Sequence, residues 1–367
     1  MPVSPALSED LAAAVADLYE AAEGTLIETI RKALDQGWDS PLWAQLRLAQ
    51  LGQLQTAINE IITALQADAT GAIHQAVAEA YDRGSQAAVA ELGALSPAVH
   101  AIPSGAQAID RLARAVVDDT GPVYLRMLRT STDAYRTVIA RASAPAVLGE
   151  QTRRQAAQSA LNQFADRGVT GFVDNAGRSW ELRSYVEMAM RSATARAALD
   201  AHSDRLGAAD IELVIVSQAP EECPLCRPWE RKILARTGAP GKREVQVEHA
   251  TEDDEMVTVE VAGSLPEARA AGLMHPNCRH TVSAYVPGVS RIPEEQPSRV
   301  TYEDTQKQRY LERQTRKWKR RAAAAVDDQE RKRANANVRA YQKRIRELVA
   351  DTGLPRKSHR EQTAAAR

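Results

Sequence analysis

The chain has 367 residues, of which 44% are hydrophobic and only 4% aromatic; this composition is typical of alanine-rich helices with thin cores and of one or two domains. Its net charge of −1 hides an asymmetry, because residues 301–367 hold 19 Lys/Arg against 9 Asp/Glu and the preceding residues are correspondingly acidic. No apolar run reaches the ~18 residues of a membrane span, the opening residues lack a secretion-signal pattern, and three cysteines gathered between positions 223 and 278 do not suit an extracellular disulfide scaffold, so we expect a protein made in a reducing cytoplasm.

The first part of the chain, residues 1–104, predicts a helical region. Apolar side chains recur every three or four positions over 11–34, 41–67 and 71–92, which is the spacing of one buried helical face. Pro97 and Pro103 then mark a linker over 95–105. The apolar faces are broad enough either for a self-contained bundle or for a bundle that also binds a partner.

Residues 105–204 continue the helical pattern. Helices are predicted over 106–118, 122–142 and 148–167, followed by a segment rich in Gly, Asp and Asn at 168–178. Such residues favour a tight turn or a small hairpin. A further helix is expected from Trp180 to about residue 200, and we expect Asp174, Gly177 and Arg178 to serve the turn rather than a site.

The helical periodicity ends near residue 205, and residues 205–290 indicate a small α+β module. A β-branched run at 211–216 and a second at 281–286 indicate strands, while 242–249 and 256–261 alternate as in a hairpin around an acidic turn. One or two helical turns are expected at 265–271. Residues 301–350 predict one basic helix and 351–367 a disordered tail, so the predicted fold class is mainly α with a small α+β module.

Two clusters of metal-ligating residues lie inside this module. Cys223 and Cys226 form a Cys-x2-Cys pair, and His275, Cys278 and His280 crowd into six positions about fifty residues later. Thiolates and imidazoles at this spacing suit tetrahedral zinc, which needs four of the five. The three cysteines are the expected ligands, and the fourth is His275 or His280, with spacing favouring His275.

Other interpretations of these residues stay open at this point. The cysteines can pack as small hydrophobic residues, join in a disulfide, or include a catalytic thiol. A zinc-stapled nuclease would need further His or Asp ligands that do not follow His280, and Cys278 and His280 would point to opposite faces of an extended segment. Trp229 is expected to pack over the cluster, and we predict no catalysis.

At these residues the sequence resembles the phage minor capsid protein 2 family, a relative of the MuF-like head morphogenesis proteins. The resemblance rests on Cys223-Pro-Leu-Cys226-Arg-Pro-Trp229, on His275-Pro-Asn-Cys278-Arg-His280, on an Asp-x-x-Gly-Arg-x-Trp block at 174–180 and on a Tyr/Gln/Arg helix at 302–313. It covers roughly 160–350. Position 280 departs from relatives that carry Cys there, which leaves the fourth ligand undecided.

The resemblance implies a virion structural protein of phage head morphogenesis. It implies a place inside the capsid near the portal vertex, with the portal and other capsid proteins as partners and no membrane association. It also implies that the Cys/His residues are structural and that zinc is a structural cofactor. The alternative is a zinc-stapled nuclease or a toxin-like effector, because MuF-like domains can be fused to toxins.

The basic helix predicts contact with packaged double-stranded DNA. Its cations cluster between positions 313 and 321, where Trp318 lies among them, and they would neutralise phosphates without reading bases. The alternative is a solvated helix within the assembly. The predicted DNA-contacting residues are Arg313, Arg316, Lys317, Lys319, Arg320 and Arg321.

Overall fold

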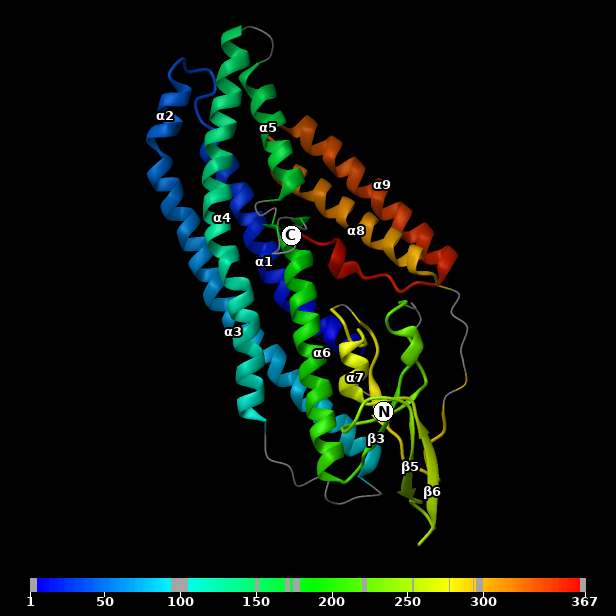
Figure 1. The fold of residues 1–367 in the computed structure, drawn as a ribbon. Coiled ribbons are helices and arrows are strands. Elements are labelled where there is room, and N and C mark those ends of the chain that lie inside the picture. Colours follow the sequence, from blue (N-terminus) through cyan, green and yellow to red (C-terminus); the bar gives the residue numbers. More distant parts are fainter. Residues whose placement is uncertain are drawn as a thin grey trace. The chain divides into compact units, whose positions relative to one another are not determined.

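The structure is a computed structural model that describes residues 5–93, 105–148, 152–168, 172–173, 179–219, 223–252, 254–276, 278–292, 294 and 300–363. Long helices dominate it, and a small group of antiparallel strands follows α6 (Figure 1), so the predicted fold class is confirmed. The helices are α1 (Pro5–Leu34), α2 (Trp43–Ala49), α3 (Leu51–Leu92), α4 (Ala106–Leu148), α5 (Arg153–Arg167), α6 (Leu182–Ala208), α7 (Leu265–Ala270), α8 (Tyr302–Ala323) and α9 (Asp328–Thr352). The strands are β1 (Phe172–Val173), β2 (Ser179–Trp180), β3 (Leu213–Val216), β4 (Ile233–Ala235), β5 (Arg243–Glu248), β6 (Met256–Val261) and β7 (Val282–Ala284).

Several predicted helices merge in the structure. The helices expected at 41–67 and 71–92 form α2 and a continuous α3, in which Gly71 has open space around its Cα and causes no break. The helices expected at 106–118 and 122–142 are joined in α4 across Pro122. The buried Val123 and Met127 hold the chain in register there, although proline removes one backbone donor.

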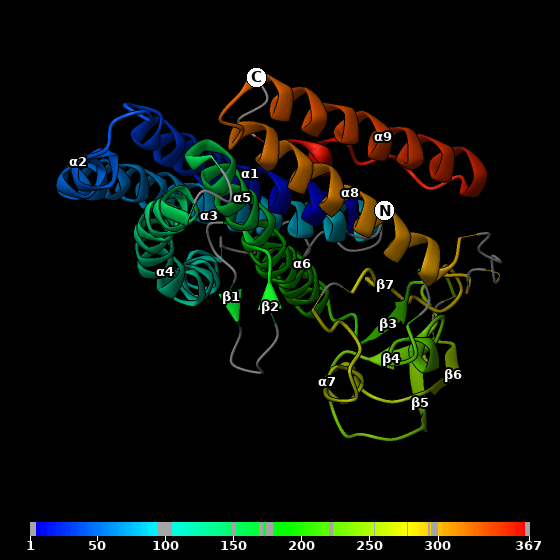
Figure 2. The ribbon, with the colours of Figure 1, turned by 90° about the horizontal axis from the view of Figure 1, so that it is seen from above.

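The basic region predicted as one helix is two. α8 ends before Ala324 and Ala325, which are buried, and α9 begins after Asp327, whose side chain accepts a hydrogen bond from the Glu330 amide at 2.8 Å. This is an ordinary N-cap that stabilises a new helix start. α8 and α9 lie side by side in both ribbon views (Figures 1 and 2), and Leu311, Ile345 and Leu348 form their shared core.

Two compact units make up the chain. One comprises residues 1–12, 73–116 and 188–302, and the other comprises residues 13–72, 117–187 and 303–367. The second unit is helical, and hydrogen bonds link segments that are far apart in the sequence. The hydroxyls of Tyr19 and Tyr124 are 2.8 Å apart, and the Tyr135 hydroxyl donates to the Arg47 carbonyl at 2.9 Å.

The tail was predicted to be disordered, but its described part packs within the helical unit. Leu354 is 6% exposed and Glu361 only 1%, and Glu361 accepts two hydrogen bonds from Arg356. Gly353, at a φ of +74°, ends α9 and turns the chain back. The sequence did not reveal this because the anchoring residues are polar and few.

The first unit contains the predicted α+β module. Its three-stranded sheet has the order β4-β3-β7, and all neighbouring strands are antiparallel. The predicted hairpin is confirmed, because β5 pairs with β6 over six residue pairs. β4 was not predicted from the sequence. The β3 residues Val214 and Val216 pack with Leu199 and Leu206 of α6, so one face of the sheet packs against this helix.

The remaining expectations concern the Gly-rich segment and the linker. β1 and β2 form a two-stranded antiparallel pair, as a small hairpin here predicts, but Trp180 lies in β2 and the next helix, α6, begins at Leu182. Asp174, Gly177 and Arg178 lie outside the described residues, as does most of the linker at 95–105. In the described part of the chain, no helix is both long and apolar enough to cross a bilayer.

Candidate metal centre

The first arm of the centre is a tight turn at Cys223–Cys226. The amides of Cys226 and Arg227 both donate to the Cys223 carbonyl, at 3.1 and 3.0 Å, so the two cysteine side chains project from one turn. A short 3-10 helix, Arg227–Trp229, follows. Cys226 is fully buried in the module core, and Trp229 packs against that core, as expected from the sequence.

The second arm follows α7. Ser264 and Glu267 form a reciprocal capping box that fixes the start of this helix, and Gly272 and Met274, with φ of +107° and +61°, turn the chain sharply after it. The Cys278 amide then donates to the His275 carbonyl at 2.9 Å. This second turn presents His275 and Cys278 toward the first arm.

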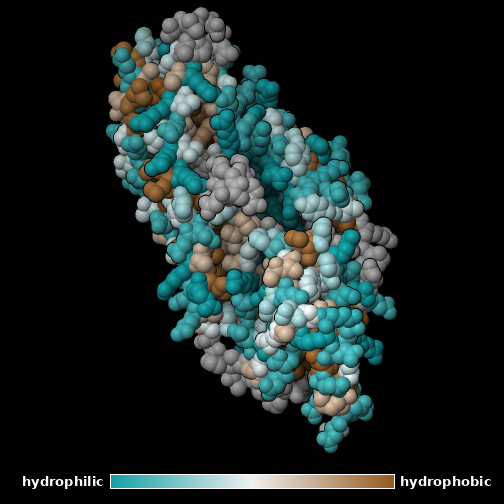
Figure 3. All heavy atoms as spheres, viewed as in Figure 1, coloured by the Kyte–Doolittle hydropathy of each residue, from teal (hydrophilic) through white to brown (hydrophobic). Residues whose placement is uncertain are grey.

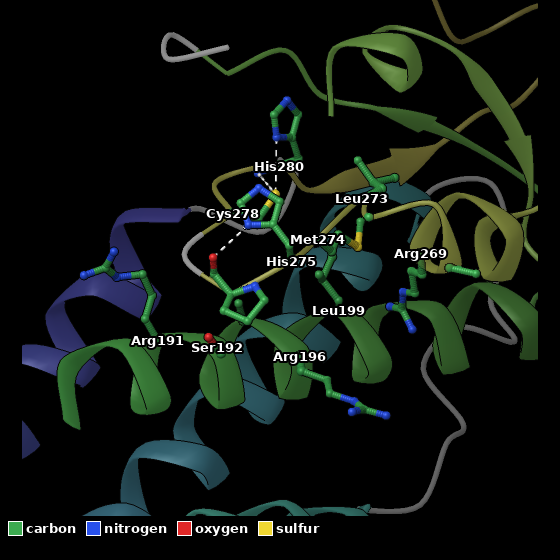
Figure 4. Close-up of a pocket in the computed structure, with 14 residues that line it drawn as sticks. Arg191, Ser192, Arg196, Leu199, Arg269, Leu273, Met274, His275, Cys278 and His280 are labelled. Carbon is green, nitrogen blue, oxygen red and sulfur yellow. Dashed lines mark hydrogen bonds between the residues drawn. The ribbon is translucent and has the colours of Figure 1, made fainter. Parts of the chain in front are cut away.

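The two arms bring all five predicted ligands together. Cys223 Sγ lies 3.1 Å from His275 Nε2, Cys226 Sγ lies 3.6 Å from Cys278 Sγ, and Cys278 Sγ lies 3.3 Å from His280 Nδ1. The ligand atoms form two groups, Cys223–Cys226–His275 and Cys226–Cys278–His280, each within 4.8 Å and sharing Cys226. All three cysteines are free thiols. Figure 4 shows His275, Cys278 and His280 on the second arm.

Both histidines are oriented by a second hydrogen bond. His275 Nδ1 lies 2.8 Å from the Pro276 carbonyl, which can only accept, so Nδ1 carries the proton and Nε2 is left with its lone pair toward Cys223. His280 Nε2 lies 2.5 Å from Glu230 Oε1, which leaves Nδ1 toward Cys278. Metal-bound histidines in proteins are held in this way, by a carbonyl or carboxylate on the far nitrogen. These thiol and imidazole donors could therefore hold a metal ion.

Burial and mutual contacts within the cluster shift the pKa values of its thiols and of His280. Burial and the neighbouring Cys278 raise the pKa of the Cys226 thiol, because a thiolate there would be poorly solvated and close to a second sulfur. Burial also opposes ionisation of Cys278, but hydrogen bonds from His280 outweigh it and lower the pKa of Cys278. The pKa of His280 is raised by Cys278 and Glu230 against the effect of burial.

One expectation about this cluster was wrong. Cys278 and His280 were expected to point to opposite faces of an extended segment, yet their side chains meet at 3.3 Å. The segment is not a strand at this point, since β7 begins only at Val282, and the His280 amide also turns toward Cys278 Sγ at 3.4 Å. The expectation also misapplied strand alternation, because residues two positions apart in an extended segment point to the same face.

The chain is similar to a known family of phage proteins. The chain matches the phage minor capsid protein 2 family over residues 3–350. The chain belongs to this family. Two phage structural proteins are also similar to it. One, a structural protein of Lactococcus phage LL-H, is 27% identical over 242 residues, 64% of this chain and 62% of that protein. The other, a structural protein of Lactococcus phage mv4, is 36% identical over 102 residues, 26% of this chain and 83% of that protein.

The matches differ in how much of each protein they cover. The chain spans less than two thirds of the LL-H protein. No solved structure matches the chain. The resemblance noticed from motifs covered roughly 160–350, whereas the family match includes the N-terminal helices as well. A broad apolar helix pattern without distinctive residues gave no sign of that relationship.

The six cations predicted to contact DNA differ in how far they are exposed to solvent. Arg316 and Arg320 are buried, at 3% and 5% exposed, and donate to the Glu181 carboxylate at 2.5 and 2.6 Å. Burial opposes ionisation of Glu181, but the two guanidinium groups hold its pKa well below its usual range. Arg316 and Arg320 therefore face inward and are not available to phosphate, which corrects the sequence interpretation for these two residues.

The other four are nearer the surface. Arg321 makes two hydrogen bonds of 2.5 Å to Asp166, with Lys317 3.4 Å from the same carboxylate, and Lys319 donates to Gln362 at 2.9 Å. Arg313 is exposed. The sequence interpretation counted charge without knowing its partners. The carboxylates concerned, Asp166 in α5 and Glu181 just before α6, lie more than 130 residues earlier.

The sequence interpretation also missed two sets of functional candidates. Glu230, which orients His280, lies 50 residues before it and had no metal-ligand spacing to reveal it. On α9, an exposed row of cations was passed over because it is spread along the helix rather than clustered. A spacing of 7, 4 and 3 positions was the available signal, since it repeats on one helical face. This row comprises Lys332, Arg339, Lys343 and Arg346.

Proposed function

We propose that this member of the phage minor capsid protein 2 family is a structural protein inside the phage head, near the portal vertex, which contacts packaged DNA without reading its sequence. The family and the two phage structural proteins similar to the chain support a virion role. The DNA contact is carried by a single observation, the row of exposed cations along α9.

The α9 row is positioned for a polyanion. Ala334, Val338, Ile345 and Leu348 are the buried residues of α9, and the cationic row lies on the opposite face of the helix. At about 1.5 Å per residue, the row from Lys332 to Arg346 extends over roughly 21 Å. The face of α8 and α9 that is visible in Figure 3 is mainly hydrophilic. An elongated cationic face of this kind matches a phosphate backbone.

The charge of the row is largely uncompensated. Within the part of the chain that the structure describes, Lys332, Arg339 and Arg346 form no ion pair, while Lys343 lies 3.7 Å from Glu347. Surface pairs as long as this contribute little, so Lys343 also remains available. Four phosphate contacts predict a salt dependence with a slope of about −3 to −4 in log K against log salt.

The test compares two triple variants. Lys332→Gln/Arg339→Gln/Arg346→Gln removes three cations from α9, and Lys242→Gln/Arg83→Gln/Arg114→Gln removes the same three side-chain types from exposed positions elsewhere, where they are 67%, 58% and 74% exposed. Binding is measured by fluorescence anisotropy with labelled duplexes of two unrelated sequences. In the α9 variant, the slope of log K against log salt should become less negative by about three. Equal loss in both variants, or a preference for one duplex, would contradict the proposal.

We propose further that the Cys/His cluster holds one structural zinc ion. Cys223, Cys226 and Cys278 with one of the two histidines would close the coordination sphere and leave no position open for a reacting water. Glu230 gives His280 an acceptor at 2.5 Å and thereby supports His280 as the fourth ligand. His275, whose Nε2 lies 3.1 Å from the Cys223 sulfur, would then stay outside the coordination sphere.

Metal analysis of the purified chain tests this directly. About one zinc per chain is expected, falling to near zero in Cys226→Ser. His280→Ala should lose more zinc than His275→Ala if His280 is the ligand. A metal-free chain whose melting temperature does not change with a chelator would contradict the staple.

The position near the portal rests on the family alone and has its own test. Cross-linking and mass spectrometry of intact virions should give peptides that join the N-terminal helices to the portal protein. Cross-links confined to the outer surface of the capsid would contradict the proposed location.

A further inference from the structure

A pocket lies beside the metal centre, within the unit that contains it. One wall is a face of α6, where Arg191, Ala195 and Leu199 recur at helical spacing, and the other is the segment from Arg269 to His280. Its volume is about 670 Å³. This falls within the roughly 300–1,000 Å³ of pockets that bury most of a small ligand.

The lining of this pocket is apolar with cationic ends. Leu199, Leu273 and Met274 form the middle, while Arg191 lies at one end and Arg196 and Arg269 lie at the other (Figure 4). Among the described residues, no Asp or Glu lines it. Apolar burial combined with one sign of charge selects an amphipathic anion.

The charge at the double-arginine end is not balanced. Arg196 and Arg269 share a single carboxylate, that of Asp200, at 3.6 and 3.4 Å. One carboxylate between two guanidinium groups leaves an excess of one positive charge.

We propose that this pocket binds a peptide segment of another virion protein, one that carries a carboxylate next to a bulky apolar side chain. The apolar side chain would lie against Leu199 and Met274, and the carboxylate would pair with Arg269 and Arg196. Methionine adapts its shape to different apolar partners, which suits the recognition of a peptide. The middle of the pocket offers neither an aromatic platform for bases nor cations for phosphates, so a nucleic acid strand fits it poorly.

The pocket shares a wall with the metal centre. His275, Cys278 and His280 belong both to its lining and to the candidate ligands. A metal that fixes these side chains would therefore fix the wall, and removing it with a chelator should weaken peptide binding. This inference rests on the proposed assembly role, because the occupant is taken to be a virion protein.

The test uses the full chain and fluorescein-labelled, overlapping 15-residue peptides that cover the portal and major capsid proteins of the same phage. Binding is measured by anisotropy. At least one peptide with an acidic residue beside Leu, Met or Phe should bind, and Arg269→Glu should weaken it at least tenfold. Arg114→Glu is the control, since Arg114, like Arg269, is a helical arginine paired with an aspartate but lies outside the pocket, and this variant should bind the peptide normally.

A second variant tests the apolar middle. Ala195→Trp would fill the pocket, whereas Ala193→Trp places the same side chain on α6 at a half-buried position outside it. Ala195→Trp should abolish binding and Ala193→Trp should retain it, with circular dichroism confirming that both are folded. No bound peptide, or binding unchanged in Arg269→Glu and Ala195→Trp, would overturn the proposal. Neither result affects the α9 test of DNA contact, so the two proposals can fail separately.

Discussion

At the scale of single residues, Glu230 affects the metal centre although it is not itself a candidate ligand. Its side chain is 7% exposed and accepts from His280 at 2.5 Å, so it fixes which imidazole nitrogen faces Cys278. Glu230 also accepts a longer hydrogen bond, of 3.5 Å, from the Ala219 amide, and such contacts offset the cost of burying its carboxylate. We therefore regard Glu230 as a positioning residue for the metal centre.

Glu230→Gln should weaken zinc binding without removing a ligand. An amide accepts a weaker hydrogen bond than a carboxylate and does not stabilise the developing positive charge on a metal-bound imidazole, so a loss of about 10- to 100-fold in zinc affinity is expected. Competition with a chromophoric chelator measures it. Glu260→Gln, which alters an exposed glutamate paired with Lys242, is the control, and equal affinities in the two variants would refute the role.

A second residue-scale prediction concerns Glu20 in the helical unit. Glu20 is 4% exposed, and burial raises its pKa to about 7 although Arg183 and Arg316 lie beside it. Because the folded state binds this proton more tightly than the unfolded state, whose carboxyl has a pKa near 4.5, the free energy of unfolding should fall as pH rises from about 4.5 to about 7.

Glu20→Gln should remove this part of the pH dependence. Between pH 5 and 7.5 the wild-type chain should lose roughly 2–3 kcal/mol more stability than the variant. Urea unfolding at a series of pH values measures the difference, in which the contributions of the histidines cancel. Glu28→Gln on the same helix is the control, because the pKa of Glu28 is lowered by Lys32 and its effect lies below pH 4.5. A difference of the opposite sign would show that Glu20 is ionised when folded.

At the scale of elements, α8 is held by buried charge rather than by a wide apolar face. Leu311 is buried, but so are Glu312, Arg316 and Arg320, and the two arginines converge on Glu181. Pairs of this kind are not strong net stabilisers, yet losing one partner leaves the other charged and buried. They fix one position for the helix in the unit.

The α8 arginines should therefore differ in a graded way when replaced by alanine. Arg320→Ala should cost about 3–5 kcal/mol, because Glu181 and Glu23 lose a buried partner. Arg321→Ala, which breaks a half-exposed pair with Asp166, should cost about 1 kcal/mol or less, and the exposed Arg313 almost nothing. Denaturant midpoints at neutral pH give the order, and equal costs at the three positions would contradict this placement.

The elements also show which parts of the structure the sequence could predict. The β5–β6 hairpin and the Cys/His arms were predictable because local alternation and ligand spacing carry them. β4 was not, since three residues become a strand only by pairing with β3. The break between α8 and α9 falls in an alanine run that favours helix locally, and the burial of Ala324 and Ala325 decides it.

The site was predictable to the same extent. Local spacing identified the five candidate ligands, but the partners that orient them come from distant positions, as Glu230 does for His280. Likewise, a count of cations could not separate Arg320, which pairs with Glu181, from Arg339, which faces solvent on α9. Side-chain pairing across more than a hundred residues depends on the fold and has no signature in the local sequence.

At the scale of the whole molecule, stability has a different physical origin in each of the two compact units. The helical unit buries Tyr19, Leu26, Ile30 and Trp43 together with its ion pairs. The unit with the metal centre has a three-stranded sheet of short strands, a core that includes Cys226 and Leu273, and the two Cys/His arms. A small core of this kind gains most from a metal staple.

Metal removal should therefore loosen one unit selectively. When a zinc chelator is added, amide hydrogen exchange should accelerate in β3, β4 and β7, where the strands join the two arms, and should stay unchanged in α8 and α9. Adding zinc back should restore protection and magnesium should not, because thiolates and imidazoles bind the softer ion. Faster exchange throughout both units would mean that the metal supports the whole chain, and unchanged exchange in the three strands would mean that hydrogen bonds among the thiols and imidazoles suffice without a metal.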